Sequence, residues 1–138
     1  MNYTFPITKE MACARNMINV SYKSALVVGR ALNNKPYLKA RKLIENLVTE
    51  KVPLKGKDVG KYHTKAAREI LKMIDSVESN AKAKNLPYEK MSLFVAVHKG
   101  PSLYRMRTKH MYGKQLKACN VQVVLKGEKV GTGEKVRR

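Results

Sequence analysis

Three histidines are the side chains of this sequence best suited to acid–base chemistry, and two cysteines are those best suited to metal binding. His63, His98 and His110 are the residue type that a small ribonuclease uses as proton donor and acceptor. Each lies near Lys or Arg, and no adjacent carboxylate can orient it. Cys13 and Cys119 are isolated, without CxxC spacing or a nearby His pair. The sequence therefore predicts no enzyme, no metal site and no cofactor, and it places both thiols in buried or half-buried strands.

A second set of residues carries charge rather than catalytic chemistry. No Asp or Glu occurs from Lys90 to Gly127, and the basic residues inside that segment include Lys99, Arg105, Arg107, Lys109, Lys114 and Lys117. The whole chain has 138 residues, 29 Lys plus Arg against 10 Asp plus Glu, and a formal net charge of +19. Like charges repel in a solvated loop, whereas a polyanion offsets that repulsion by releasing counterions. Nucleic acid is therefore the expected partner, and a solvated basic loop is the alternative.

Two β-patterned segments flank these cations and predict how they are presented. Residues 91–97 lead in and residues 119–125 lead out, which indicates a hairpin whose distal part, about 99–118, is a cationic finger. Gly100-Pro101 begins the finger, and proline removes a ladder donor there, so we expect the hairpin to bend away from the sheet. The return strand alternates in polarity, which predicts one packed face and one half-exposed face.

The residue types of the finger favour RNA. Arg105 and Arg107 are two positions apart and therefore share one face of an extended strand. Tyr104 and Tyr112 offer rings on which bases can stack. Gly113 can adopt the positive φ that a hairpin tip requires.

The rest of the sequence predicts the elements that hold the finger. Residues 11–20 have the pattern of a first strand, and helical spacing marks 22–32 after a Ser21 cap, 37–48 after Pro36, and a long helix capped by Thr64. Gly29 weakens the first helix, so we expect it to serve close packing. The long helix has an inward stripe of Ala67, Ile70, Leu71, Ile74, Val77 and Ala81 and an outward set of Lys65, Arg68, Lys72, Asp75, Glu78 and Lys82.

Length and composition favour one domain at 1–127, followed by a flexible basic tail at 128–138. Residues 1–10 are expected to form an irregular arm, and 51–62, with four lysines, a basic loop. The apolar runs are too short to span a bilayer. The first ten residues lack the charge and apolar pattern of a secretory signal, so a cytoplasmic location is expected.

Several segments together resemble the universal large-subunit ribosomal protein twenty-two family. They are Gly-Pro-Ser-Leu-Tyr-Arg-Met-Arg from Gly100, Tyr-Gly-Lys from Tyr112, Asn-Val-Gln-Val-Val-Leu from Asn120, Val-Ser-Tyr-Lys-Ser-Ala-Leu from Val20 and Lys-Ala-Ala-Arg-Glu-Ile-Leu from Lys65. The similarity extends from about residue 17 to 126, and the insertion containing Val52-Pro53 resembles the archaeal and eukaryotic branch.

The resemblance implies an α+β fold with three helices packed on a three-stranded antiparallel sheet and a long extended β-hairpin. It also implies a structural constituent of the large ribosomal subunit that binds 23S-type rRNA, supports assembly and lines the nascent-polypeptide exit tunnel on the ribosome. Carried over by position, the RNA contacts are Lys23, Arg105, Arg107, Lys109, Gly113 and Lys114, and the charge and stacking arguments add Lys99, Tyr104, His110, Tyr112 and Lys117. The sequence departs from the family at Tyr104, Thr108 and Gln115, where the family more often has a basic residue, Pro and a small residue.

Implied partners are large-subunit rRNA, neighbouring ribosomal proteins and the nascent polypeptide, with no membrane segment. Two other functions are compatible with the residues alone. One is a stand-alone basic nucleic-acid-binding protein of the RNA-chaperone or chromatin type. The other is the small basic nuclease that the three histidines would serve.

Overall fold

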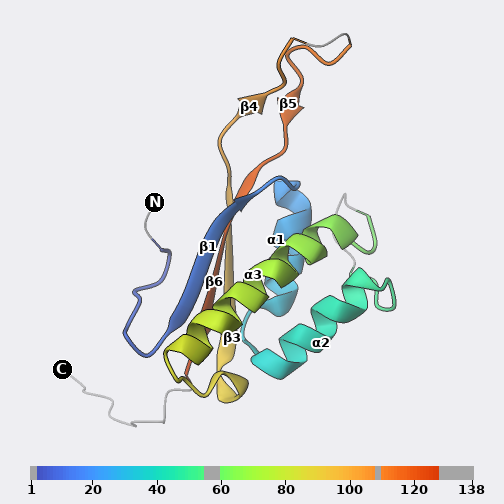
Figure 1. The fold of residues 1–138 in the computed structure, drawn as a ribbon. Coiled ribbons are helices and arrows are strands. Elements are labelled where there is room, and N and C mark those ends of the chain that lie inside the picture. Colours follow the sequence, from blue (N-terminus) through green and yellow to red (C-terminus); the bar gives the residue numbers. More distant parts are fainter. Residues whose placement is uncertain (1–2, 55–59, 108–109, 128–138) are drawn as a thin grey trace, which may run out of the picture.

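A four-stranded antiparallel sheet lies at the centre of the molecule (Figure 1). The computed structural model describes residues 3–54, 60–107 and 110–127. Its elements are β1 (Ala12–Ile18), α1 (Tyr22–Leu32), β2 (Lys35–Pro36), α2 (Tyr37–Val48), α3 (Thr64–Ala83), the 3-10 turn η1 (Tyr88–Lys90), β3 (Ser92–Lys99), β4 (Leu103–Tyr104), β5 (Gln115–Leu116) and β6 (Cys119–Lys126). The sheet order is β1-β6-β3-β2, and β4 and β5 pair separately. The predicted α+β class is confirmed, and the two-residue β2 adds a short fourth strand to the three expected ones.

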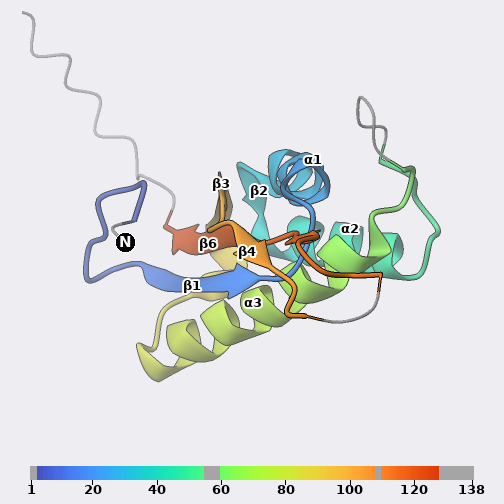
Figure 2. The same ribbon diagram turned by 90° about the horizontal axis from the view of Figure 1, so that it is seen from above.

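All three helices lie on the same side of the sheet (Figures 1 and 2). Helix α3 crosses β1 and β6, α1 packs on β3, and α2 packs on α3. On the helix-facing side of the sheet, Leu93, Val121 and Val123 are fully buried. Burying this apolar area is the main stabilising contribution to such a small protein. None of the described helices has the length and apolar character needed to cross a membrane.

Gly29 lies where α1 approaches β3 most closely. A Cβ atom at this position would be 3.0 Å from Val97 Cγ2 and 3.4 Å from Val95 Cγ1. Most Cβ atoms lie farther from their neighbours, so a larger residue would require Val97 or the helix to shift by a few tenths of an ångström. The prediction that Gly29 serves close packing is confirmed.

The long helix follows the predicted stripe with three differences. Ala67, Ile70, Ile74, Val77 and Ala81 are buried as expected. Leu71 is only half-buried, whereas Ala66 and Met73, which the stripe did not include, are buried. A stripe defined by spacing alone is uncertain at its margins, where the neighbouring element decides which side chain is covered.

The predicted Thr64 cap is wrong. His63 precedes the helix with φ 50°, in the left-handed region, and Thr64 is the first helical residue. The first turn closes on His63, whose carbonyl accepts a hydrogen bond from the Ala67 N–H at 2.9 Å. No side chain caps this helix. The hydroxyl of Thr64 is therefore one residue too late to accept the bonds that a cap accepts.

The second face of the sheet is covered by the N-terminal arm, which corrects the prediction of a half-exposed face. Thr4 donates from its backbone N–H and from its hydroxyl to Gln122 Oε1, at 2.9 and 3.0 Å. Phe5 packs edge-on against Phe94 with ring centroids 4.8 Å apart. Gln122 and Val124 are consequently only 2% and 3% exposed. The arm thus gives the central strand β6 two buried faces.

Glu78 was predicted to point into solvent, but it joins α2 to α3. Its carboxylate accepts hydrogen bonds from the Tyr37 hydroxyl at 2.6 Å and from Arg41, and it pairs with Lys82 at 2.8 Å. Hydrogen bonds from Lys82 and Tyr37, together with the charge of Arg41, lower the pKa of Glu78 to about 2. Burial and its bond to Glu78 raise the pKa of Tyr37 to about 12. The side chain of Glu78 is 16% exposed, so this cluster ties the two helices together.

Candidate nucleic-acid interface

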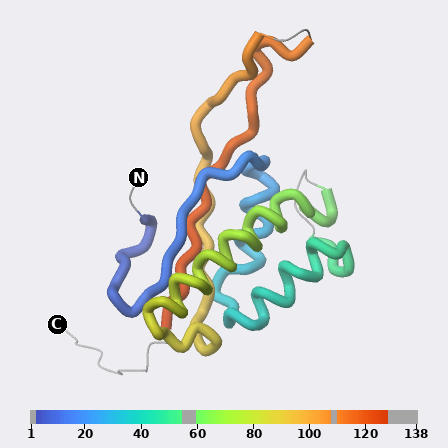
Figure 3. The backbone as a smooth tube through the Cα atoms, in the orientation of Figure 1, coloured from blue at the N-terminus to red at the C-terminus, as the bar shows by residue number. Residues whose placement is uncertain are grey.

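The finger is a narrow hairpin that continues β3 and β6 beyond the sheet (Figure 3). The main ladder ends at Lys99, which pairs with Cys119. Pairing resumes in β4 and β5, where Leu103 is opposite Leu116 and Tyr104 is opposite Gln115. Between these two ladders, the Gly100 N–H bonds to the Ala118 carbonyl at 3.2 Å. The predicted finger at about 99–118 therefore corresponds to a separate pair of strands set off from the main sheet.

Gly100 is required at the start of the finger by a close approach of the two chains. A Cβ atom here would lie 2.8 Å from the backbone carbon and oxygen of Ala118, which no real Cβ does. Pro101 follows and has no N–H to offer the opposite strand. Two local features therefore mark the expected boundary between sheet and finger. Pro101 lacks a hydrogen-bond donor, and Gly100 allows a close approach to the backbone of Ala118.

The tip turns through residues with positive φ. His110 has φ 63° and Gly113 has φ 71°, and Lys114 N–H bonds to the Met111 carbonyl at 3.3 Å. The predicted positive φ of Gly113 is confirmed. The rings expected to stack are well exposed, Tyr104 by 63% and Tyr112 by 74%. Lys109, one of the predicted RNA contacts, lies outside the described residues.

The root of the finger borders an open pocket of about 640 Å³. We call it the root pocket; its lining includes Ser21, Lys23, Lys99, Pro101, Gln115 and Lys117. Three of the predicted RNA contacts, Lys23, Lys99 and Lys117, are thus brought together from three different parts of the chain. No acidic residue is among those that line it in the described part of the chain. Sequence spacing groups Lys99 with the finger, but it does not reveal that α1 contributes Lys23 to the same pocket.

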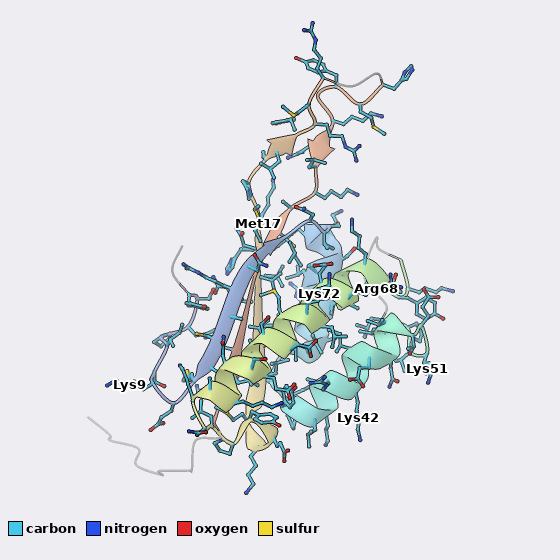
Figure 4. All side chains as sticks on the ribbon, viewed as in Figure 1. Lys9, Met17, Lys42, Lys51, Arg68 and Lys72 are labelled. Carbon is cyan, nitrogen blue, oxygen red and sulfur yellow. The ribbon has the colours of Figure 1, made fainter. Side chains whose placement is uncertain are left out.

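A second pocket, of about 440 Å³, adjoins the first and shares Ser21 and Lys117 with it. Its other lining residues include His63 and Lys65 at the start of α3. Arg68 lies one turn further along the same helix, exposed toward solvent (Figure 4). Lys65 and Arg68 were predicted only to lie on the outward face of the helix. The absence of an acidic residue in the first turn of α3 was the available signal that this end of the helix is cationic.

Acidic residues are segregated from this region. Among the described residues they are Glu10, Glu45, Glu50, Glu69, Asp75, Glu78 and Glu89. Four of them, Glu45, Glu69, Asp75 and Glu78, form ion pairs with Arg41, Lys72 or Lys82 on α2 and α3. No acidic residue belongs to β1, α1, β3, the described finger or β6. Their absence leaves the cations of the finger and its root without an intramolecular counter-charge on those elements.

The histidines lie in three separate settings. His63 precedes α3, His98 is in β3 and shares a 2.8 Å hydrogen bond with the Thr4 hydroxyl, and His110 is at the finger tip. Cys13 is half-buried in β1 and Cys119 is buried in β6, which confirms the structural role expected of both thiols. Burial raises the pKa of the Cys119 thiol. Within the described ranges, no group of three His, Cys, Asp or Glu side chains could hold a metal ion.

Fold and surface together define an α+β protein whose distinctive feature is an exposed, cationic β-hairpin. The chain belongs to the ribosomal protein L22p/L17e family, whose members match it over residues 13–126. This family is a structural, non-enzymatic class, as the sequence predicted.

Curated relatives from archaea support the same assignment. The large ribosomal subunit protein uL22 of Staphylothermus marinus is 29% identical over 126 residues, which cover 75% of this chain and 80% of the relative. The protein of that name from Archaeoglobus fulgidus is 31% identical over 116 residues, covering 71% and 73%. The one from Aeropyrum pernix is 51% identical over 51 residues, covering 36% and 33%. The predicted resemblance to the archaeal branch is confirmed.

Proposed function

We propose that this ribosomal protein is a constituent of the large subunit, where it binds rRNA through the finger and its root and supports assembly. The observation that carries this proposal is an exposed hairpin with cations and stacking rings and no acidic residue among its described positions. Phosphate contacts give such a surface its affinity, and exposed rings add stacking on unpaired bases. The expected contacts are Lys23, Lys99, Tyr104, Arg105, Arg107, Lys109, His110, Tyr112, Gly113, Lys114 and Lys117.

Arg105 and Arg107 are the residues we expect to matter most. The planar guanidinium group can bind two phosphate oxygens in parallel or stack on a base, whereas ammonium binds phosphate as a compact point charge and cannot stack. Both side chains are exposed, while the Arg105 backbone N–H is bonded to the Lys114 carbonyl at 3.0 Å. This backbone bond fixes the position of Arg105 relative to the opposite strand, while the side chains of both arginines remain accessible.

The proposal is tested with the double variant Arg105→Gln/Arg107→Gln and a 23S-type rRNA fragment. Each lost phosphate contact should reduce the slope of log affinity against log salt by roughly 0.7 to 0.9. We expect weaker binding, a slope smaller by about 1.5, and an unchanged melting temperature because neither residue is in the core.

Lys135→Gln/Arg137→Gln, outside the described residues, is the matched control with the same change of charge. We expect this variant to lose less affinity for RNA than the finger variant. A segment with no apolar pattern must lose more conformational entropy for each contact that it orders. Equal losses from both pairs would favour a diffuse electrostatic binder and would reject the finger as principal anchor.

The subunit assignment has its own test. A constituent of the large subunit should sediment stoichiometrically with it in high-salt sucrose gradients, whereas a stand-alone nucleic-acid-binding protein should be released. We further propose, from the family, a cytoplasmic ribosome location and a finger that lines the exit tunnel beside the nascent polypeptide. A photocrosslinker in place of the exposed Tyr112 should then label nascent chains in translating ribosomes.

A further inference from the structure

The root pocket lies at the junction between the packed body of the molecule and the finger. Lys23 belongs to α1, within the packed body of the molecule, and Lys99 is the last residue of β3. Pro101 and Gln115 belong to the finger, and Lys117 lies at its root, between β5 and β6. A ligand in this pocket would therefore contact the body and the finger together.

The connection between the body and the finger is thin. All described residues from 101 to 107 and from 110 to 117 are exposed, so no buried packing fixes the angle of the finger. Backbone pairing is interrupted at Pro101, and the bonds near it are the 3.2 Å bond from Gly100 to Ala118 and a 3.2 Å side-chain bond from Gln115 to Ser102. The bond from Gln115 to Ser102 is exposed, and exposed hydrogen bonds open readily.

The chemistry of the pocket calls for an oxyanion. Three lysines line it, and no acidic residue does so within the described part of the chain. Ser21 precedes α1, but its hydroxyl makes no capping bond, which corrects the predicted Ser21 cap. The hydroxyl of Ser21, which lines the pocket, can donate a hydrogen bond to an anion. A phosphodiester offers two free oxygens, which can accept bonds from a cation on each side of the junction.

We propose that a phosphate of the RNA backbone binds in the root pocket and fixes the angle of the finger relative to the body. This inference rests on the proposed function, because it takes RNA as the partner. It adds a separate role: the lysines of the root orient the finger, whereas the arginines further out supply affinity along its length.

The test measures the orientation directly. Spin labels are placed at Leu38→Cys on α2 and Met111→Cys at the tip, both exposed and neither among the expected RNA contacts, in a Cys13→Ser/Cys119→Ala background. The distance distribution between the labels is recorded without ligand, with saturating 23S-type rRNA fragment, and with inorganic phosphate alone. The same measurements are made on Lys23→Gln/Lys99→Gln/Lys117→Gln, the root variant. A control variant, Lys9→Gln/Lys42→Gln/Lys51→Gln, removes three exposed lysines that lie away from the pocket (Figure 4).

We expect a broad distribution in the free protein that narrows with RNA in the unsubstituted chain and in the control variant. The root variant should still bind RNA through the finger, with a salt slope smaller by about 2, but its distribution should stay broad. The inference would be overturned if RNA narrowed the distance distribution equally in the root variant, or if it failed to narrow it in the control variant. A distribution that is already narrow without RNA would also overturn it. Narrowing by inorganic phosphate alone would reject RNA as the source of the anion. Absence of RNA binding by every protein would instead reject the proposed function.

Discussion

Glu78 is the residue whose protonation should most affect the stability of the fold. Its pKa is held at about 2, below the ordinary 4.5, by bonds from Lys82 and Tyr37 and by Arg41. A carboxylate with a lowered pKa contributes its stabilisation above the ordinary value and loses it as the pH falls toward the folded-state value. The cluster should therefore stabilise the protein fully at neutral pH and weaken between about pH 4.5 and pH 2.

We predict that Glu78→Gln lowers the free energy of unfolding at pH 7 by on the order of 2 kcal/mol. The variant should also lose stability less steeply than the unsubstituted protein on acidification between about pH 4.5 and pH 2. Urea denaturation across that range is the measurement. Glu89→Gln, at an exposed carboxylate of η1, is the control and should behave like the unsubstituted protein. Parallel pH profiles for Glu78→Gln and the unsubstituted protein would contradict the role given to the cluster.

Single residues were predictable from the sequence where local chemistry decides their role. The positive φ of Gly113 follows from its place at a hairpin tip, and the packing role of Gly29 follows from its place in a helix that contacts a strand. Both roles were therefore predicted correctly. Thr64 and Glu78 were not, because the first depends on the left-handed backbone of His63 and the second on α2 packing beside α3. The shared pocket of Lys23 and Lys117 also depends on tertiary structure, since these residues are 94 positions apart (117 minus 23).

At the scale of elements, the helices were the most predictable part. Their apolar spacing repeats over three or more turns, so the signal is strong, and α1, α2 and the strand at 12–18 lie where the sequence placed them. The packing of the N-terminal arm on the sheet and the strand β2 could not be predicted. Neither segment has a periodic pattern, and each is ordered by partners distant in sequence, such as Gln122 for Thr4 and Leu93 for Lys35.

Helix α3 supports the sheet through Ile70 and Ile74, both fully buried. Truncating a buried Ile to Ala removes apolar contacts and leaves a cavity, which costs about 2 to 5 kcal/mol. We predict a loss of that size for Ile70→Ala in chemical denaturation. Leu71→Ala, next in the chain but only half-buried, is the matched control and should cost clearly less. Equal costs at both positions would mean that the packed face of α3 is wrongly assigned.

For the molecule as a whole, we expect the body and the finger to differ in stability when no RNA is present. The exposed segment 103–117 has few apolar contacts to hold it, whereas α3 is anchored in the core. Amide hydrogen exchange in the free protein should be fast in the described part of this segment and slow in the middle of α3. Added rRNA should slow exchange in the finger. Uniform protection of both regions without RNA would show that the finger is an ordinary packed hairpin.

The position of β6 has a consequence for how the protein folds during its synthesis. This strand lies between β1 and β3, so the first strand of the sheet pairs with residues 119–126, more than 100 positions later in the chain. Contacts of such wide sequence separation slow folding, because a long loop must close before they form. Until residue 126 has been made, β1 and β3 lack their common neighbour, and their unpaired edges and apolar faces are open to aggregation. The early chain therefore needs protection until the central strand arrives, and completing the sheet is a late, nearly all-or-none event.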